Sequence, residues 1–230
     1  MKSSKKLWIA SIFFLLLFVA LTGALTAVDV GPAGDFDTPV GLSGINSAVY
    51  ELLPFNQDVY DLTELLGKAV LLVVPCFALV GLVQLIARRS FRKVDGALYL
   101  LVLFYVVVLG IYVAFDKFVV INNRPTLENV PSFPSSHTLM AVTFVGTAVF
   151  LIRRALKGGV LKGLVTLLGT LVIIAITVGR LMSGVHWLTD VLASVLLGLS
   201  LNLAYMALVG KVKGYKKSSP SGKVFYLKKN

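Results

Sequence analysis

The stretch ALYLLVLFYVVVLGIYVAFDKFVVINNRP, residues 97–125, joins a long apolar run to a short polar segment. The run at 97–116 is almost entirely apolar, and about 20 such residues are enough for a helix to cross the hydrocarbon core of a bilayer. Lys117 follows directly, and Arg124 stands before Pro125. A single lysine at the end of a membrane helix is usually an interfacial anchor, so the role of these two cations depends on what surrounds them.

The composition of the whole chain is that of an integral membrane protein. Hydrophobic residues make up 57% of the 230 residues and charged residues 14%, with a mean hydropathy of +0.88, which is far from the average of soluble domains. No repeat or low-complexity linker divides residues 1–230, so we expect one domain. The predicted fold is all-α, a bundle of six transmembrane helices. The apolar runs that predict these helices cover residues 8–28, 69–87, 97–116, 137–152, 163–179 and 190–209.

Basic residues are distributed unevenly over this predicted topology. Of the 22 Lys and Arg residues, 18 fall on one side of the six-helix arrangement. The positive-inside rule therefore predicts a multi-pass protein of the cell membrane with both termini in the cytoplasm. The net charge of +11 reflects this asymmetry and requires no nucleic-acid partner, and the basic tail at 211–230 is expected to contact anionic lipid headgroups.

The first apolar run follows the basic segment MKSSKK and could be read as a signal peptide. It is longer than the usual hydrophobic region of a signal peptide, which has about 7–15 residues. A retained transmembrane helix is therefore the better interpretation.

The first predicted outer loop, residues 29–67, carries seven of the 11 acidic residues and no Lys or Arg. Within it, Ile45, Val49 and Leu52 follow helical spacing, and Pro54 ends the pattern. We expect a short amphipathic helix in the outer interface. It either guards lipid entry or covers the bundle, and covering is the more common role of such a helix.

Charged and polar residues are predicted to converge on the outer face. Four predicted helices have an end on that face, because the third and fifth run outward and the fourth and sixth start there. The only two histidines of the chain are among the residues at these ends. The predicted cluster comprises Lys117, Arg124, Ser135, His137, Arg180 and His186.

The spacing of His186 and Asp190 indicates a paired imidazole and carboxylate. On a helix, residues four apart lie on one face, so the carboxylate can accept a hydrogen bond from one ring nitrogen and leave the other as a nucleophile or base. Cations, a serine hydroxyl and backbone donors beside this pair suit a tetrahedral oxyanion such as phosphate. Cys76 is the only cysteine, so no disulfide framework or thiolate metal cluster is expected.

Three motifs in this region resemble the signature of the type-2 phosphatidic acid phosphatase superfamily, the membrane lipid phosphatases related to vanadium haloperoxidases. The family patterns are K-x6-RP, PSGH and SR-x5-H-x3-D, and their order and spacing match residues 117–190. The matching segments are Lys117-x6-Arg124-Pro125, Pro134-Ser135-Ser136-His137 and Arg180-x5-His186-x3-Asp190. Two positions depart from the family, since Ser136 replaces a glycine and Gly179 replaces a serine.

The resemblance implies a catalytic role for three residues. His186 would attack phosphorus and become phosphohistidine, and Asp190 would orient it. His137 would protonate the leaving oxygen and then activate water. The residues implied to hold the phosphate oxygens are Lys117, Arg124, Ser135, Arg180 and, through its backbone amide, Ser136. No metal and no other cofactor is expected, because the fixed cations neutralise the phosphoryl charge.

These observations predict a metal-independent phosphatase that hydrolyses a membrane lipid phosphate or diphosphate at the outer surface. Phosphatidylglycerol phosphate, phosphatidic acid and a polyprenyl diphosphate are all compatible substrates. The alternative is a non-catalytic protein that binds or transports a lipid phosphate, although it would not need His186 and Asp190 in register. Outside the cluster, Asn122 and Asn123 are interpreted as turn residues, and Trp187 as part of the interfacial aromatic belt.

Overall fold

The computed structural model describes residues 2–212 and contains six helical spans long and apolar enough to cross a membrane. The second span consists of α3 and α4, and the fourth consists of α6, a π-helical turn η2 and α7. The prediction of six transmembrane helices is therefore confirmed. In chain order the elements are α1 (Lys2–Ala27), β1 (Gly31–Ala33), β2 (Thr38–Val40), α2 (Ser43–Leu52), α3 (Gln57–Leu71), α4 (Val73–Arg88), η1 (Phe91–Lys93), α5 (Gly96–Lys117), α6 (Ser136–Met140), η2 (Ala141–Val145), α7 (Gly146–Ala155), α8 (Gly159–Met182) and α9 (Leu188–Val209).

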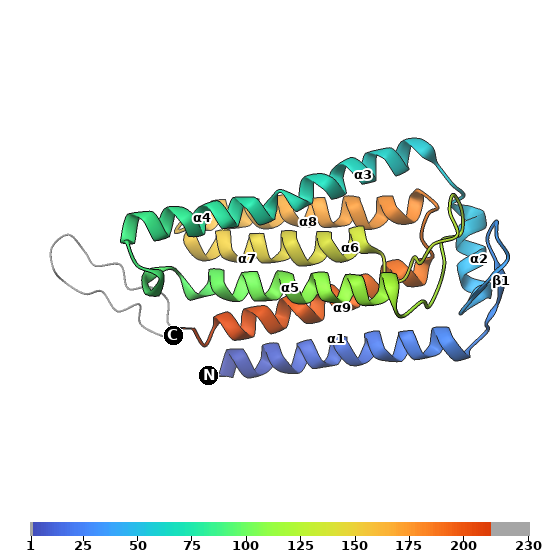
Figure 1. The fold of residues 1–230 in the computed structure, drawn as a ribbon, viewed down its shortest axis with the longest axis horizontal. Coiled ribbons are helices and arrows are strands. Elements are labelled where there is room, and N and C mark those ends of the chain that lie inside the picture. The colour runs from blue at the N-terminus through green and yellow to red at the C-terminus, as the bar shows by residue number, and fades with distance from the viewer. Residues whose placement is uncertain (1, 213–230) are drawn as a thin grey trace.

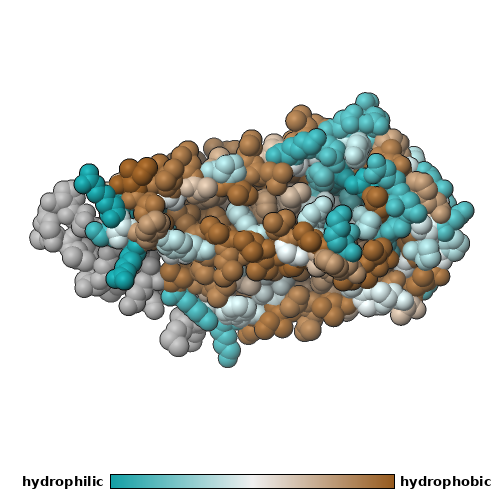
Figure 2. Space-filling model, viewed as in Figure 1, coloured by the Kyte–Doolittle hydropathy of each residue, from teal (hydrophilic) through white to brown (hydrophobic). Residues whose placement is uncertain are grey.

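The spans run side by side along the long axis of the molecule, and the polar connections gather at its two ends (Figure 1). The N-terminus and the end of α9 lie at one end, whereas α2, the β1–β2 hairpin and the loop at 118–135 lie at the other. On the face drawn in Figure 2, apolar side chains cover the middle and hydrophilic ones gather at the ends. This is the surface that a bilayer requires. The predicted basic tail lies outside the described residues from 213 onward.

Helix α9 lies at the centre of the packing. It contacts α1 along its length, and Ser11 and Ser200 each donate a hydroxyl hydrogen bond to the other's backbone carbonyl, at 2.8 and 2.9 Å. On its other side the Tyr205 hydroxyl donates to the Ala97 carbonyl on α5 at 2.9 Å. Small and polar side chains of this kind hold membrane helices together where lipid gives no hydrophobic driving force between them.

The second span begins earlier than predicted, at Gln57 instead of near residue 69, so the outer loop is shorter than 29–67. Asn56 caps α3, since its side-chain oxygen accepts a hydrogen bond from the Val59 amide at 3.0 Å. The first turns of α3 carry Asp58, Asp61 and Glu64. Because these acids lower the local hydropathy, the start of the helix does not appear as an apolar run. Acidic residues are compatible with a helix that projects beyond the hydrocarbon.

The predicted amphipathic helix is present as α2, but a polar residue holds it in place. Asn46 is fully buried, and its amide donates to Thr189 Oγ1 at the start of α9 and to the Gly41 carbonyl, both at 2.9 Å. The assignment of Trp187 to an interfacial belt is wrong, because this side chain is only 1% exposed and packs against the hairpin and Tyr50 of α2. The helix and hairpin thus cover the end of the bundle.

The π-helical turn η2 lies in the fourth span below the residues predicted for the site. A π turn displaces one backbone carbonyl from the regular pattern, and such turns often occur at functional sites. Here Asn202 of α9 donates a hydrogen bond to the Val142 carbonyl at 2.7 Å. Gly146 allows this approach, because a Cβ at that position would overlap the Asn202 amide. The π turn η2 and helix α9 are therefore fixed against each other just beneath the site.

Candidate active site

His186 lies in the short turn between α8 and α9, and the turn depends on a glycine. Gly184 adopts a φ of 70°, and a Cβ there would overlap the backbone of Pro54 and Phe55, which packs against it. The amide of Asn56 donates to the Ser183 carbonyl at 3.2 Å and ties the start of α3 to the same turn. His186 is held 5% exposed by these contacts.

The two ring nitrogens of His186 have different neighbours. Nδ1 lies 3.6 Å from an Asp190 oxygen, which is ion-pair distance but too long for a hydrogen bond. Nε2 lies 3.4 Å from the Arg180 guanidinium. Arginine can only donate, so Nε2 is the lone-pair nitrogen and Nδ1 carries the proton that faces Asp190. Burial, together with the cations of Arg180 and Arg124, holds the pKa of His186 well below its ordinary value. The imidazole is therefore neutral and suited to act as a nucleophile.

Asp190 is fully buried and is held by two donors. Asn122 Nδ2 donates to one carboxylate oxygen at 3.0 Å, and the Trp187 amide donates to the other at 3.2 Å. The second bond also caps the start of α9. The interpretation of Asn122 as a turn residue only is wrong, because its side chain is buried and its Oδ1 accepts from the Gly41 amide at 3.3 Å. Asn122 thereby connects the carboxylate to the segment before α2.

Arg180, near the end of α8, is fully buried and is surrounded by side chains of α3. Its guanidinium donates to Glu64 at 3.0 Å and to Thr63 Oγ1 at 3.3 Å, and it lies 5.4 Å from the centre of the Tyr60 ring. Together with the contact to His186 Nε2, these interactions orient the guanidinium plane beside the nucleophile.

His137 lies in the first turn of α6 and packs directly on α3. Its Nε2 is 3.3 Å from the same Glu64 oxygen that contacts Arg180. Gly67 makes this approach possible, because a Cβ at that position would overlap the His137 ring. Both histidines predicted to flank the phosphate therefore contact one guanidinium and carboxylate pair, His186 through Arg180 and His137 through Glu64.

Several buried donors around the histidines have no partner within the described residues. They are Arg124 Nε, Arg180 Nε and the hydroxyl of Ser135. Ser135 precedes α6 without using its hydroxyl as a cap, although its backbone is fixed by Ser194, which donates to its carbonyl at 2.9 Å. Buried polar groups are normally paired, so these donors are suited to an oxyanion ligand.

Arg124 is carried by a loop that folds back on itself. The Arg124 amide donates to the Val130 carbonyl and the Ser132 amide donates to the Asn122 carbonyl, both at 2.9 Å. Arg124, Ser132, Ser136 and His186 line a small polar pocket with a volume of about 60 Å³. The loop and the starts of α6 and α9 thus bring most of the predicted site residues together.

Lys117 is the predicted site residue that the structure does not bring into this group. Its side chain is 69% exposed, and its ammonium contacts the neighbouring Asp116 at 2.8 Å. It lies at the end of α5, next to Asp116, which lines the small pocket. Its role in binding phosphate stays a prediction.

The two departures from the family motifs have local explanations. Gly179 faces α3, and a Cβ there would come within 2.6 Å of the Thr63 methyl group. A serine at this position would therefore push α3 away from Arg180. Ser136 lines both the small pocket and the larger groove described next.

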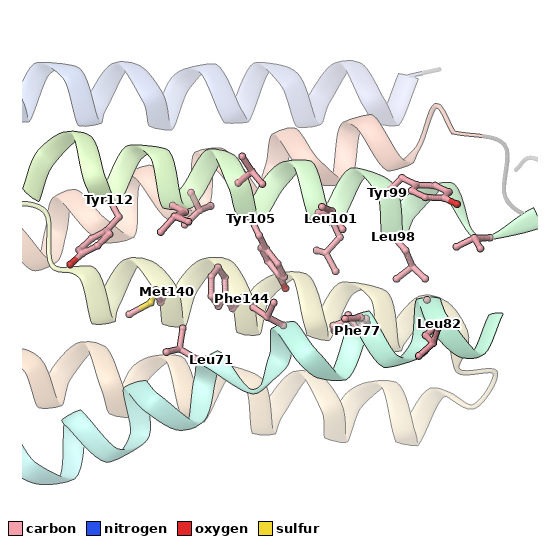
Figure 3. Close-up of a pocket in the computed structure, with 18 of the residues that line it drawn as sticks. Leu71, Phe77, Leu82, Leu98, Tyr99, Leu101, Tyr105, Tyr112, Met140 and Phe144 are labelled. Carbon is pink, nitrogen blue, oxygen red and sulfur yellow. The ribbon is translucent and has the colours of Figure 1, made fainter. Parts of the chain in front are cut away.

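An apolar groove lies next to the small pocket and runs along the bundle. It has a volume of about 670 Å³ and lies between α4, α5 and the fourth span (Figure 3). Leu71, Phe77 and Leu98 are among the side chains that line it, together with Tyr105. The groove and the small polar pocket share Tyr112, Ser136 and Leu139 in their linings.

One face of α3, a helix whose first turns were predicted to be loop, also contributes to the site. Four residues at positions i, i+3, i+4 and i+7 of this helix contact or adjoin Arg180 and His137. Their helical spacing was a usable signal, but it lay in a segment interpreted as loop. These residues are Tyr60, Thr63, Glu64 and Gly67. Over residues 2–212, no group of three or more His, Cys, Asp or Glu side chains is arranged to hold a metal ion.

Comparisons with known proteins agree with this architecture. Residues 115–213 match the family model of the PAP2 superfamily. No curated protein sequence matches the chain. Among solved structures, the chain is similar to the transmembrane PAP2 type phosphatidylglycerolphosphate phosphatase from Bacillus subtilis, with a TM-score of 0.67 and 17% sequence identity. That match covers 88% of this chain and 97% of the other, and it shows that the two proteins share a fold.

Proposed function

We propose that this chain is a member of the PAP2 superfamily, whose family model matches residues 115–213, and that it is a metal-independent phosphatase. It would hydrolyse a membrane lipid phosphate or diphosphate through a phosphohistidine on His186. The observation that carries the proposal is the junction of two cavities. A polar pocket lined by Arg124 and His186 adjoins an apolar groove, and Tyr112 and Ser136 line both cavities. A polar headgroup and its hydrocarbon tail therefore have adjoining binding sites.

The first half-reaction follows from the orientation of the histidines. The neutral Nε2 of His186 forms a bond to phosphorus while the bond from phosphorus to the leaving oxygen breaks. His137, as imidazolium, gives its proton to that oxygen, and Asp190 stabilises the positive charge that develops on His186. Arg124, Arg180 and Ser135 donate to the non-bridging oxygens, with Lys117 and the Ser136 amide as further donors.

The second half-reaction reverses these roles. His137, now neutral, takes a proton from a water molecule as the water oxygen bonds to phosphorus. The bond between phosphorus and His186 Nε2 breaks, and inorganic phosphate is released. Both histidines then return to their starting protonation states.

The groove favours a lipid over a soluble phosphomonoester. It follows α5 from Leu98 to Tyr112, which at 1.5 Å per residue is a path of roughly 20 Å, well over half of the hydrocarbon thickness of a bilayer. A soluble substrate would have no use for such a surface. Phosphatidylglycerol phosphate, the substrate named for the similar structure, a polyprenyl diphosphate and phosphatidic acid all combine a phosphoryl group with a long chain.

We place the site on the outer face of the cell membrane and both termini in the cytoplasm. The distribution of basic residues supports this orientation, because 18 of the 22 Lys and Arg residues belong to the termini and to the connections at the same end of the predicted topology. The basic tail would contact anionic headgroups of the inner leaflet.

A phosphate-release assay tests the proposal. Purified protein in detergent is given phosphatidylglycerol phosphate, phosphatidic acid, a polyprenyl diphosphate and a soluble phosphomonoester in parallel. We expect release from at least one lipid, little from the soluble ester, no effect of a chelator, and a loss in His186→Ala of several orders of magnitude. Wild-type turnover by His186→Ala, or binding of all three lipids without hydrolysis, would refute the proposal in favour of a different mechanism or a binding protein.

A further inference from the structure

Glu64 lies between two groups that the proposed reaction uses. One of its carboxylate oxygens is 3.0 Å from the Arg180 guanidinium and 3.3 Å from His137 Nε2. The Glu64 side chain is 23% exposed, whereas Arg180 is fully buried and the His137 side chain is 15% exposed. The three family motifs lie at 117–190 and do not include this residue, which comes from the second transmembrane span.

The position of Glu64 is fixed by the packing of α3. One turn before it, Tyr60 lies under the Arg180 guanidinium, and the adjacent Thr63 accepts a hydrogen bond from it. Gly67, nearly one turn later, gives space to the His137 ring. The carboxylate is therefore held against both partners by neighbouring residues of its own helix.

The contact with Glu64 assigns the ring nitrogens of His137. An ionised carboxylate can only accept hydrogen bonds, so Nε2 carries the proton that faces Glu64. Nδ1 is then the nitrogen that gains and loses a proton. It is buried and has no partner among the described residues, as expected for a nitrogen that exchanges a proton with a substrate.

The charges around His137 make the carboxylate necessary. The Arg180 guanidinium of α8 contacts the same Glu64 oxygen as His137 Nε2, so a positive charge on the His137 ring forms beside a second cation. Arg124 of the loop and the neutral His186 of the turn between α8 and α9 line the small pocket together with Ser136. Within residues 2–212, Glu64 is the one carboxylate at ion-pair distance from this ring. A general acid must carry its proton before the reaction, so this site needs a nearby negative charge.

We propose that Glu64 is a positioning residue that fixes the proton on Nε2 of His137 and stabilises its imidazolium, as Asp190 does for His186. The inference rests on the proposed phosphatase function and adds a second carboxylate and imidazole pair to the site. The first pair orients the nucleophile, and the second orients the acid that protonates the leaving oxygen. Arg180 contacts one member of each pair.

The pH dependence of phosphate release tests this role. The lipid hydrolysed fastest by the wild type is used to measure kcat and kcat/KM across pH for Glu64→Gln, Glu64→Asp and the control Asp61→Asn. Asp61 lies on the same helix and contacts only Gln57 among the described hydrogen-bond partners, so its variant removes an equal charge outside the site. All variants are also compared by thermal unfolding in detergent.

We expect Glu64→Gln to lower kcat at pH 7 by about 10–100-fold. This is part of the rate enhancement of about 10²–10⁴-fold that a general acid or base typically provides. Loss of the negative charge disfavours the imidazolium, so the fall of kcat/KM at high pH should begin at a lower pH. Glu64→Asp keeps the charge and should keep a profile closer to that of the wild type, and Asp61→Asn should match the wild type in rate and profile.

Two results would overturn the inference while leaving the phosphatase function intact. The first is a Glu64→Gln enzyme with the wild-type profile, whatever its rate, because a purely structural role changes rate without moving the profile. The second is a faster Glu64→Gln enzyme, which would make the carboxylate a competitor of phosphate. If Glu64→Gln does not fold, the Glu64→Asp enzyme decides. Because aspartate keeps the negative charge, a fall of kcat/KM that begins at a much lower pH than in the wild type would count against the inference. Failure of the wild type on every lipid would instead refute the proposed function.

Discussion

Asp190 shows how much of the candidate site depends on single hydrogen bonds. Its two oxygens are held by Asn122 Nδ2 and the Trp187 amide, and only the first of these donors is a side chain. Asn122 also accepts the Gly41 amide. This one residue therefore joins the carboxylate that faces His186 to the segment that covers the end of the bundle.

Asn122→Ala should weaken the site more than a neighbouring substitution does. It leaves a buried carboxylate oxygen and a buried amide without their partners, at a cost of about 1–3 kcal/mol each. If half of this loss, about 1–3 kcal/mol, falls on the orientation of Asp190, kcat drops by roughly 5- to 160-fold. The assay is phosphate release from the preferred lipid, with folding followed by thermal unfolding.

Asn123→Ala is the matched control for this prediction. The Asn123 side chain donates only to exposed Asn129, so we expect nearly the wild-type rate. Equal rates for the two alanine variants would mean that the bond from Asn122 to Asp190 has no part in orienting His186.

Contacts between residues that are close in the sequence could be predicted, whereas contacts between distant segments could not. His186 and Asp190 are four residues apart, and they lie close together although His186 belongs to the turn just before α9 and not to the helix itself. Asn122 is 68 residues from Asp190, and Glu64 is 116 residues from Arg180. No spacing rule joins such pairs, because their proximity is set by the packing of helices and not by the geometry of one.

At the scale of elements, α3 supplies a wall of the candidate site. Its face carries Thr63 and Glu64 against Arg180, and Gly67 against His137. Gly179 on α8 makes this packing possible, because a larger residue would meet Thr63. The replacement of the family's serine by Gly179 thus has a structural reason in the close approach of α3 and α8.

Gly67→Ala should disrupt the site although alanine favours helices. In an exposed helix the change stabilises by about 1 kcal/mol, but here the new Cβ would occupy the position of the His137 ring. We expect His137 to be displaced and phosphate release to fall at least tenfold, an effect of more than 1.4 kcal/mol on the barrier. Phosphate release and thermal unfolding provide the measurement.

Gly110→Ala, in the middle of α5, controls for the helical effect alone. A Cβ at Gly110 meets nothing within 4 Å, so this variant should keep its activity and gain slightly in stability. If Gly67→Ala behaved in the same way, the close packing of α3 on His137 would be contradicted.

The limits of element prediction follow from hydropathy. Helices that face lipid appear in the sequence as apolar runs, and five of the six spans were predicted within a few residues of their observed ends. The beginning of α3 carries acids because it projects toward the polar end of the bundle. Its amphipathic spacing was the remaining signal, and it was assigned to a loop.

At the scale of the molecule, both described ends of the chain lie at one end of the bundle, opposite the candidate site (Figure 1). The positive-inside rule then predicts that the site faces outward. Labelling of single cysteines tests this orientation. In a Cys76→Ala background, a membrane-impermeant maleimide on intact cells should label Leu127→Cys in the loop before α6.

Lys157→Cys, in the connection between α7 and α8, should be labelled only after the cells are opened. Both side chains are exposed, so a difference in labelling between them reports the side of the membrane. Labelling of Lys157→Cys alone in intact cells would invert the proposed topology and move the reaction to the cytoplasmic leaflet.

The central claim is that His186 becomes covalently phosphorylated while His137 serves the leaving group. The most direct measurement is mass spectrometry of enzyme quenched during turnover of its preferred lipid. We expect an acid-labile phosphoryl group on the peptide that contains His186, and none on the same peptide of His186→Ala. Steady turnover by the wild type with no phosphoryl group on this peptide at any time, together with a wild-type rate in His186→Ala, would contradict it.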